Sequence, residues 1–330
     1  MILRAGLVFL AGLGLLVVIG LALRQPTRSR TCVPGPQADP ARLERDTRRL
    51  SLGFLPRDAG HPENLDRAAA FIKTELAAAG GKVSEQVFRV REFDQRNRAQ
   101  ERGPYRNILA VFGPDTPERL VVGAHYDAFG ELPGADDNAS GAAGLLELAR
   151  LLQKSPPRLR TELAAYTLEE PPYFATPHMG SARHAAALRR EGVRVRAMIA
   201  LEMLGTFSDA PGSQRYPVPL LRLFYPGRGD FIAVVGTLPD GGLARRTKTA
   251  MRRPDLPVYS LNSLAFVPGV DYSDHASFWA EGYPAVMVTD TAFYRNPRYH
   301  KPEDSPDLLD YARMARVVSG VHAAVLSFAP

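Results

Sequence analysis

The chain has 330 residues, of which 45% are hydrophobic and 23% charged, a composition that excludes pervasive disorder and allows a sizeable core. Its formal net charge is +6, but four of these charges belong to arginines within residues 1–30, a segment that contains no acidic residue. The rest of the chain is therefore almost neutral, which argues against a nucleic-acid partner.

An uncharged, almost wholly apolar run lies near the N-terminus, from Ala5 to Leu23, between Arg4 and Arg24. A helix rises about 1.5 Å per residue, so this run is just long enough to cross a hydrocarbon core of about 30 Å. It is longer than the apolar region of a signal peptide, and no small-residue cleavage site follows it. We therefore expect residues 1–30 to form an N-terminal transmembrane anchor, with an uncleaved signal as the alternative.

The remaining chain divides into a short linker and one globular domain. Residues 31–40 are rich in proline and polar residues and are expected to be the linker, and residues 41–330 the domain. Cys32 is the single cysteine, so no intramolecular disulfide forms and the redox compartment stays open. Three arginines follow the apolar run, which weakly favours a cytoplasmic domain by the positive-inside rule.

Within the domain, hydrophobic periodicity predicts helices alternating with short apolar strands. The helices are expected over residues 64–79, 142–152, 181–190, 243–251 and 308–327. The strands are expected over residues 82–90, 107–112, 120–124, 162–168, 197–201, 231–235, 258–266 and 285–289. This alternation predicts an α/β fold, a three-layer α/β/α sandwich whose mixed central sheet is mostly parallel, with ligands bound beyond the carboxyl ends of its strands.

Residues with metal-binding side chains follow three of these predicted strands. His125 and Asp127 come directly after the strand 120–124, and a glycine-rich turn containing Asp137 follows them. Glu169-Glu170 and Glu202 occupy the ends of two later strands. Imidazole and carboxylate together are ligand types that suit zinc, so the sequence indicates a metallohydrolase.

Five positions form a candidate two-metal set, with Asp137 as the carboxylate that bridges the metals. The other four would supply one imidazole and one carboxylate to each metal, from His125, Glu170, Glu202 and His300. Glu169 is expected to act as the general base that takes a proton from water. Asp127 is expected to accept the second N–H of the His125 imidazole and so to orient the ring.

In their order and spacing, these residues and their neighbours resemble peptidase family M28, the cocatalytic zinc aminopeptidases, over nearly the whole globular part. The stretches that carry the resemblance are residues 125–127, 133–141, 169–170, 179–181, 201–203, 273–275 and 299–304. The resemblance implies the same five ligands and Glu169 as general base. It also implies an α/β/α sandwich and, often, a non-proline cis peptide just after the bridging Asp.

One position departs from the pattern of the family. Well-known members carry Asp where this chain has Glu202, so its carboxylate stands on a side chain longer by one methylene. Glutamate is a competent zinc ligand, so we expect the site to be retained.

Other polar residues near these stretches are expected to serve turns and helix ends. Asp136 and Asn138 are expected to bond to the local backbone of their turn. Asp274 is expected to cap a short helix over residues 276–281. His275 is the best substitute ligand should Glu202 fail. Two further acids, Glu303 and Asp304, are expected to serve the first turn of the C-terminal helix.

The sequence therefore predicts a zinc-dependent aminopeptidase that removes N-terminal residues from peptides by a metal-bridged water, with two zinc ions per chain. Two alternatives stay open, a single-zinc acyltransferase like the glutaminyl cyclases and a non-catalytic receptor or scaffold domain of the same fold. We expect a single-pass membrane protein, held in the membrane through residues 5–23. The resemblance to exported enzymes outweighs the charge flank, so the catalytic domain is expected to be periplasmic or extracellular.

Overall fold

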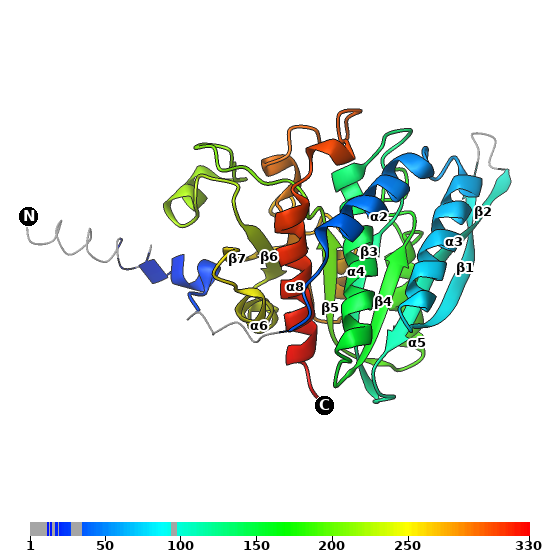
Figure 1. Ribbon diagram of the computed structural model, residues 1–330, viewed down its shortest axis with the longest axis horizontal. Coiled ribbons are helices and arrows are strands. Elements are labelled where there is room, and N and C mark those ends of the chain that lie inside the picture. The colour runs from blue at the N-terminus through cyan, green and yellow to red at the C-terminus, as the bar shows by residue number, and fades with distance from the viewer. Residues whose placement is uncertain (1–11, 13, 15–16, 19, 28–34, 94–97) are drawn as a thin grey trace, which may run out of the picture.

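The computed structural model describes residues 12, 14, 17–18, 20–27, 35–93 and 98–330. Its centre is an eight-stranded sheet with the order β1-β2-β4-β3-β5-β8-β6-β7 (Figure 1). The strands are β1 (Lys82–Phe93), β2 (Ala99–Phe112), β3 (Glu118–His125), β4 (Arg160–Tyr166), β5 (Arg194–Glu202), β6 (Ile232–Thr237), β7 (Val258–Ser263) and β8 (Ala285–Thr289).

The sheet is mixed and mostly parallel, as predicted. Strand β3 pairs in parallel with β4 and β5, β5 with β8, and β6 with β7. Antiparallel pairing joins β1 to β2, β2 to β4 and β6 to β8. The carboxyl ends of β4, β3, β5 and β8 therefore meet at one edge of the sheet, where residues following these strands come together.

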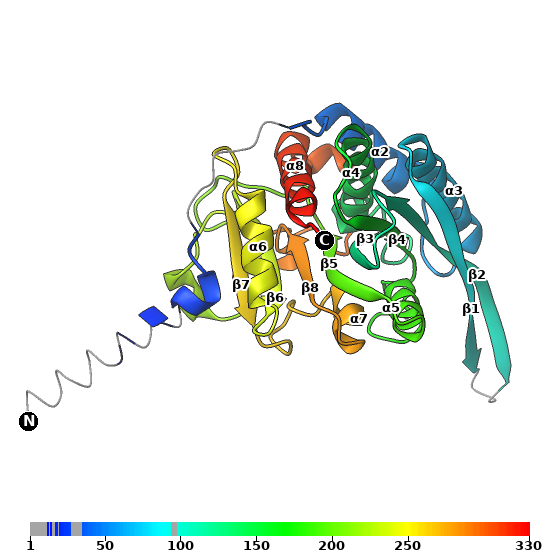
Figure 2. The same cartoon turned by 90° about the horizontal axis from the view of Figure 1, so that it is seen from below.

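Helices cover both faces of the sheet and complete the three-layer sandwich (Figure 2). One face carries α2 (Pro40–Gly53), α3 (Pro62–Ala78), α4 (Gly141–Lys154), α6 (Gly241–Met251) and α8 (Tyr311–Ser327). The other carries α5 (Gly180–Arg190) and α7 (His275–Ala280). Along β3, Leu120 and Val122 pack in the first layer and Val121 in the second, which is the alternation that pleated strands impose.

The structure differs from the sequence expectations at the N-terminal end of the domain. Helix α2 was not predicted, because its stretch is rich in arginine and its buried side chains include the polar Asp46 and Thr47. Strands β1 and β2 are longer than predicted and extend together beyond the helices as a two-stranded ribbon (Figure 2).

The predicted transmembrane run, residues 5–23, lies largely outside the described residues. Among those described, none belongs to a helix with both the length and the apolar character needed to cross a membrane.

Candidate metal centre

The parallel strands bring three of the predicted site segments to one edge of the sheet. His125 is the last residue of β3, which lies between β4 and β5. Glu202 is the last residue of β5, and Glu169-Glu170 follow the end of β4. Leu168 and Met203, which flank these glutamates, have positive φ angles of 62° and 51°. This left-handed backbone, uncommon outside glycine, turns the chain sharply where each strand ends.

The two carboxylate oxygens of Asp137 face two different histidines. Asp137 lies on the irregular helix η1 (Ala135–Ser140), and its peptide bond to Asn138 is cis. Its Oδ1 lies 3.4 Å from Nε2 of His125, and its Oδ2 lies 3.1 Å from Nε2 of His300. The side chain thus stands between the two imidazoles, which is the placement expected of a bridging carboxylate.

Each histidine is accompanied by a second carboxylate. Glu202 Oε2 lies 3.3 Å from His125 Nε2, and Glu170 Oε2 lies 3.3 Å from His300 Nε2. The side chains thus form two compact donor groups that share Asp137. In each group the donor atoms lie within 4.8 Å of one another. The members of the groups are His125, Asp137 and Glu202 in one, and His300, Asp137 and Glu170 in the other.

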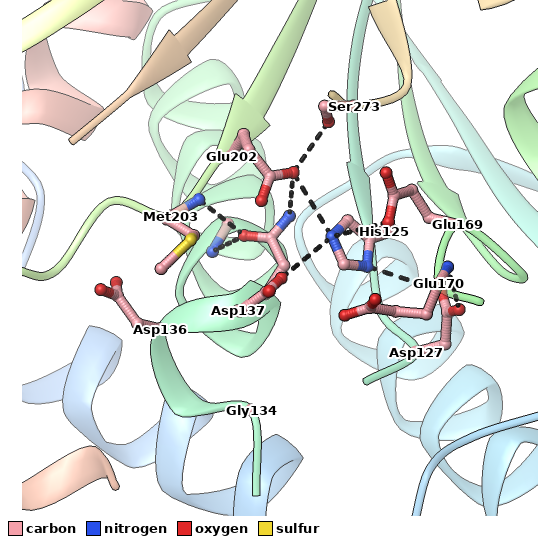
Figure 3. A network of polar contacts seen from close by, with 12 residues as sticks. His125, Asp127, Gly134, Asp136, Asp137, Glu169, Glu170, Glu202, Met203 and Ser273 are labelled. Carbon is pink, nitrogen blue, oxygen red and sulfur yellow. Dashed lines mark hydrogen bonds and ion pairs between the residues drawn. The ribbon is translucent and has the colours of Figure 1, made fainter. Parts of the chain in front are cut away.

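Glu169 and Asp127 approach His125 from its remaining sides (Figure 3). Glu169 Oε2 lies 3.7 Å from His125 Nε2. Asp127 Oδ1 lies 3.6 Å from His125 Nδ1, which is an ion-pair distance and too long for a hydrogen bond. The predicted hydrogen bond between the His125 ring and Asp127 is therefore not formed. The other oxygen of Asp127 accepts a hydrogen bond of 3.1 Å from the backbone N–H of Glu170. Asp127 therefore links the His125 segment to the paired glutamates.

Burial concentrates negative charge at this site. The side chains of Asp137, Glu169, Glu170 and Glu202 are all buried. Burial raises the pKa of Glu170 to about 7, and the neighbouring charge of Asp137 adds to the rise. Burial likewise raises the pKa of Glu169 well above its ordinary value. Buried carboxylates at this density stay ionised only where cations compensate them, and otherwise take up protons.

The donor set fits a divalent metal such as zinc. Among the described residues, no hydrogen-bond partner satisfies His125 Nε2, His300 Nε2 or Glu170 Oε1, although all three atoms are buried. Buried polar atoms without partners are rare in folded proteins, and all three belong to residues of the two donor groups. Imidazole nitrogen and carboxylate oxygen are ligand types that zinc accepts.

Three residues assigned to local turns or helix ends make long-range contacts. Asn138 also makes the predicted local bond, since its Oδ1 accepts from Gly141 N at 3.1 Å. Asp136 accepts hydrogen bonds from Gly205 N at 2.9 Å and from Asn296 Nδ2 at 2.9 Å. Asn138 donates to the carbonyl of Leu201 at 2.9 Å. The third residue, Asp304, accepts from the backbone N–H groups of both Asp136 and Asp137. The turn that carries Asp137 is therefore held by distant segments as well as by its own side chains, since Ser140 Oγ donates to the carbonyl of Asp136 at 2.7 Å.

The expectation that Asp274 caps α7 was wrong, and His275 lies outside the donor groups. Asp274 makes no capping hydrogen bond to α7 and is buried, and burial raises its pKa to about 7. His275 Nε2 donates to the carbonyl of Val270 at 2.7 Å, and its ring packs edge-on against Trp279. His275 belongs to neither donor group, so it is not a substitute for Glu202 here.

Two further supports of the ligand groups were not predicted, although Ser273 and Tyr299 lie in stretches that carry the family resemblance. Ser273 Oγ donates to Glu202 Oε2 at 2.7 Å and thereby orients the longer side chain of this ligand. The His300 ring is sandwiched between Phe129, at a centroid distance of 4.1 Å, and Tyr299, at 3.8 Å. These contacts restrict the orientation of both side chains before any metal binds.

Comparison with known proteins identifies the family of this chain. The sequence profile of Peptidase family M28 matches residues 107–325. The chain belongs to peptidase family M28. This membership confirms the predicted class, a metallopeptidase and hence a hydrolase. The matched residues 107–325 include every segment that forms the two donor groups.

Two relatives show different degrees of sequence identity to this chain. The uncharacterized protein YfbL of Escherichia coli (strain K12) is 47% identical over 293 residues, covering 86% of this chain and 87% of YfbL. Leucine aminopeptidase 1 of Pyrenophora tritici-repentis (strain Pt-1C-BFP) is 29% identical over 219 residues, covering 63% of this chain and 51% of the relative. The chain thus spans about half the length of this aminopeptidase.

Solved structures share the fold. The zinc aminopeptidase BSAP from Bacillus subtilis superposes with a TM-score of 0.68 at 17% identity, covering 89% of this chain and 96% of BSAP. A glutaminyl cyclase from Bacteroides thetaiotaomicron superposes with a TM-score of 0.67 at 17% identity, covering 89% of this chain and 100% of the cyclase. Fold similarity therefore does not separate these two activities.

Proposed function

We propose that this chain is a zinc-dependent aminopeptidase that hydrolyses the N-terminal residue from peptides. The observation that carries the proposal is the pair of donor groups that share Asp137, with Glu169 beside them. His125, Asp137 and Glu202 would hold one zinc ion, and His300, Asp137 and Glu170 the other. When bound, the two ions would supply Lewis acidity to the scissile carbonyl and to the attacking water.

Glu169 is the residue that moves protons in the proposed reaction. A base needs a pKa near the working pH, and burial has raised the pKa of Glu169 above that of an ordinary carboxyl. Its carboxylate takes a proton from the water as the oxygen attacks the carbonyl carbon. It returns that proton to the leaving amine as the C–N bond breaks. Ser273 keeps Glu202 oriented during these steps, and Asp127 lies within ion-pair distance of His125.

A cavity beside the donor groups fits a large apolar side chain. It begins at Glu202 and Tyr299 and lies against the strands β6, β7 and β8. The residues lining it are mostly aromatic or aliphatic, among them Tyr216, Leu221, Tyr225, Phe231, Val235, Tyr259, Val270, Met287 and Phe293. We propose that this cavity receives the side chain of the N-terminal residue.

An aminoacyl-anilide panel tests this function. We expect the purified protein with zinc to cleave Leu- and Phe-anilides at least about tenfold better in kcat/KM than Ala-anilide, because each buried methylene adds binding energy. Asp- and Lys-anilides are expected to be poor substrates, since the cavity is lined mostly by apolar side chains that would desolvate their charges. Equal rates across the panel would contradict the assignment of the cavity.

The glutaminyl-cyclase alternative is tested in the same preparation. A cyclase would convert a peptide with N-terminal Gln to pyroglutamate and bind a single zinc ion. Elemental analysis that finds two zinc ions, together with anilide hydrolysis, supports the aminopeptidase. One zinc ion with cyclisation of the Gln peptide would replace this proposal with the cyclase.

We further propose that residues 5–23 anchor the chain in a membrane, with the catalytic domain on the periplasmic or extracellular side. The support is the apolar run between Arg4 and Arg24. A C-terminal alkaline phosphatase fusion is expected to be active, because this reporter folds only outside the cytoplasm, and a fusion that lacks residues 1–30 is expected to be inactive. An inactive full-length fusion would reverse the proposed orientation.

A further inference from the structure

A completely buried arginine lies behind the donor groups. Arg57 stands between α2 and α3, outside the segment 107–325 that the family profile matches, and has no exposed surface. A fully buried guanidinium is rare, because its charge and its five N–H donors must all be compensated inside the protein. Its partners therefore indicate what the residue holds in place.

The guanidinium of Arg57 hydrogen-bonds to the backbone of the loop that joins two ligands. Its Nε donates to the carbonyl of Tyr126 at 2.8 Å, directly after His125. At the other end of the loop, Nη1 donates to Pro133 at 2.7 Å and Nη2 donates to Gly134 at 2.6 Å, three residues before Asp137. One side chain thus contacts both ends of the loop 126–134.

Two more hydrogen bonds join Arg57 to helix α2 and to the loop 126–134. Nη1 of Arg57 also donates to the carbonyl of Leu50 in α2, at 3.0 Å. The carbonyl of Arg57 accepts from Ala128 N at 3.0 Å. At Gly134, where φ is +50°, an added Cβ would lie 3.1 Å from Nη2 of Arg57, so the close approach depends on glycine.

We infer that Arg57 is a positioning residue of the metal centre, which sets the separation of His125 and Asp137 by clamping the loop between them. The planar fork of arginine reaches four carbonyls in different directions, whereas lysine offers three donors from a single atom. The inference rests on the proposed function in one respect, namely that the metal bound by the two donor groups is zinc. The geometry of the clamp does not depend on that identity.

Arg150 provides a matched control. It is largely buried on α4 and also contacts the α2–α3 layer, through Asp46 at 2.7 Å and Glu75 at 2.5 Å. Its partners are carboxylates of the helical layer and not the ligand-bearing loop. Both Arg57→Met and Arg150→Met remove a guanidinium from the protein interior, but only Arg57→Met releases the loop 126–134.

The test compares the two variants in zinc binding and in hydrogen exchange. We expect Arg57→Met to weaken zinc binding about 10–100-fold, measured by competition with a chromophoric chelator, as removal of supporting contacts does in other metal sites. In the metal-free protein, amides 126–137 are expected to exchange faster than in the unsubstituted chain. Arg150→Met is expected to lower the Tm while zinc affinity and exchange of amides 126–137 stay unchanged.

Equal losses of zinc affinity in both variants, or unchanged exchange of amides 126–137 in Arg57→Met, would overturn the inference. Should Arg57→Met fail to fold, Arg57→Lys tests the inference in its place. The loss of zinc affinity is then expected to be smaller than that expected for Arg57→Met, because the charge and some donors remain. Should the unsubstituted chain bind no zinc, the proposed function fails, and the exchange experiment on the metal-free protein still decides the role of Arg57.

Discussion

Replacing Glu169 with Gln is expected to lower kcat by at least about 10²- to 10⁴-fold, the contribution that general acid–base catalysis makes. Glutamine has nearly the same shape as glutamate but cannot take a proton from water. Glu169 forms a third group of close donor atoms with His125 and Glu170 but belongs to neither of the two groups that share Asp137, so we expect Glu169→Gln to keep its full zinc content. The measurements are kcat on Leu-anilide and zinc per chain by elemental analysis.

The stability of the Glu169→Gln variant provides the control for this result. A carboxyl whose pKa is raised by burial stabilises the fold below its ordinary pKa, and this contribution is lost as the pH rises through the raised pKa. At neutral pH the metal-free variant should therefore be no less stable than the unsubstituted chain. Loss of zinc together with activity would show instead that Glu169 is a metal ligand, as its place beside His125 and Glu170 would allow.

The sequence was sufficient to predict the α/β sandwich and the positions of the strand-end residues. Residues such as His125 and Glu202 follow short apolar runs, and parallel strands bring such ends to one edge of a sheet. The structure places all five predicted ligands together, in the two groups with Asp137 between them that the charge types suggested. The sequence was informative here because an apolar run that forms a strand, and the polar residue that follows it, are recognised from neighbouring residues alone.

The supports of the site were not predictable, because they join residues that are far apart in the chain. Asp304 bonds to the backbone of Asp136, 168 positions away, and Ser273 bonds to Glu202, 71 positions away. Arg57 bonds to carbonyl groups, which every residue has, so no partner residue type marks its role. Local sequence does not show which distant residue such a side chain contacts, and polar residues that make these contacts resemble ordinary turn and cap residues.

Glu202 illustrates how these supports allow a departure from the family pattern. Its longer side chain has one more rotatable bond than aspartate and so loses more conformational freedom when it is held in place. Ser273 fixes the oxygen that faces His125, and Asn138 Nδ2 lies 3.5 Å from the same oxygen. These contacts hold the same oxygen that faces His125, so they keep the longer side chain oriented toward the histidine.

Replacing Asp137 with Ala is expected to remove both zinc ions and the peptidase activity together. The two oxygens of this side chain face His125 and His300 separately, so no other residue of the set serves both donor groups. Without it, each group keeps one imidazole and one carboxylate, which is too few protein ligands for a zinc site. Elemental analysis should therefore find less than one zinc ion per chain.

Two companion variants identify Asp137 as the shared ligand. His300→Ala removes a donor from one group only, so it should lose one zinc ion and retain the other at His125 and Glu202. Glu303→Ala removes an exposed carboxylate three residues from His300 and should change neither zinc content nor activity. If Asp137→Ala retained one zinc ion, as His300→Ala should, then Asp137 would serve a single metal. The two donor groups would then have to bind their ions independently, and the shared-carboxylate arrangement on which the proposed chemistry depends would be wrong.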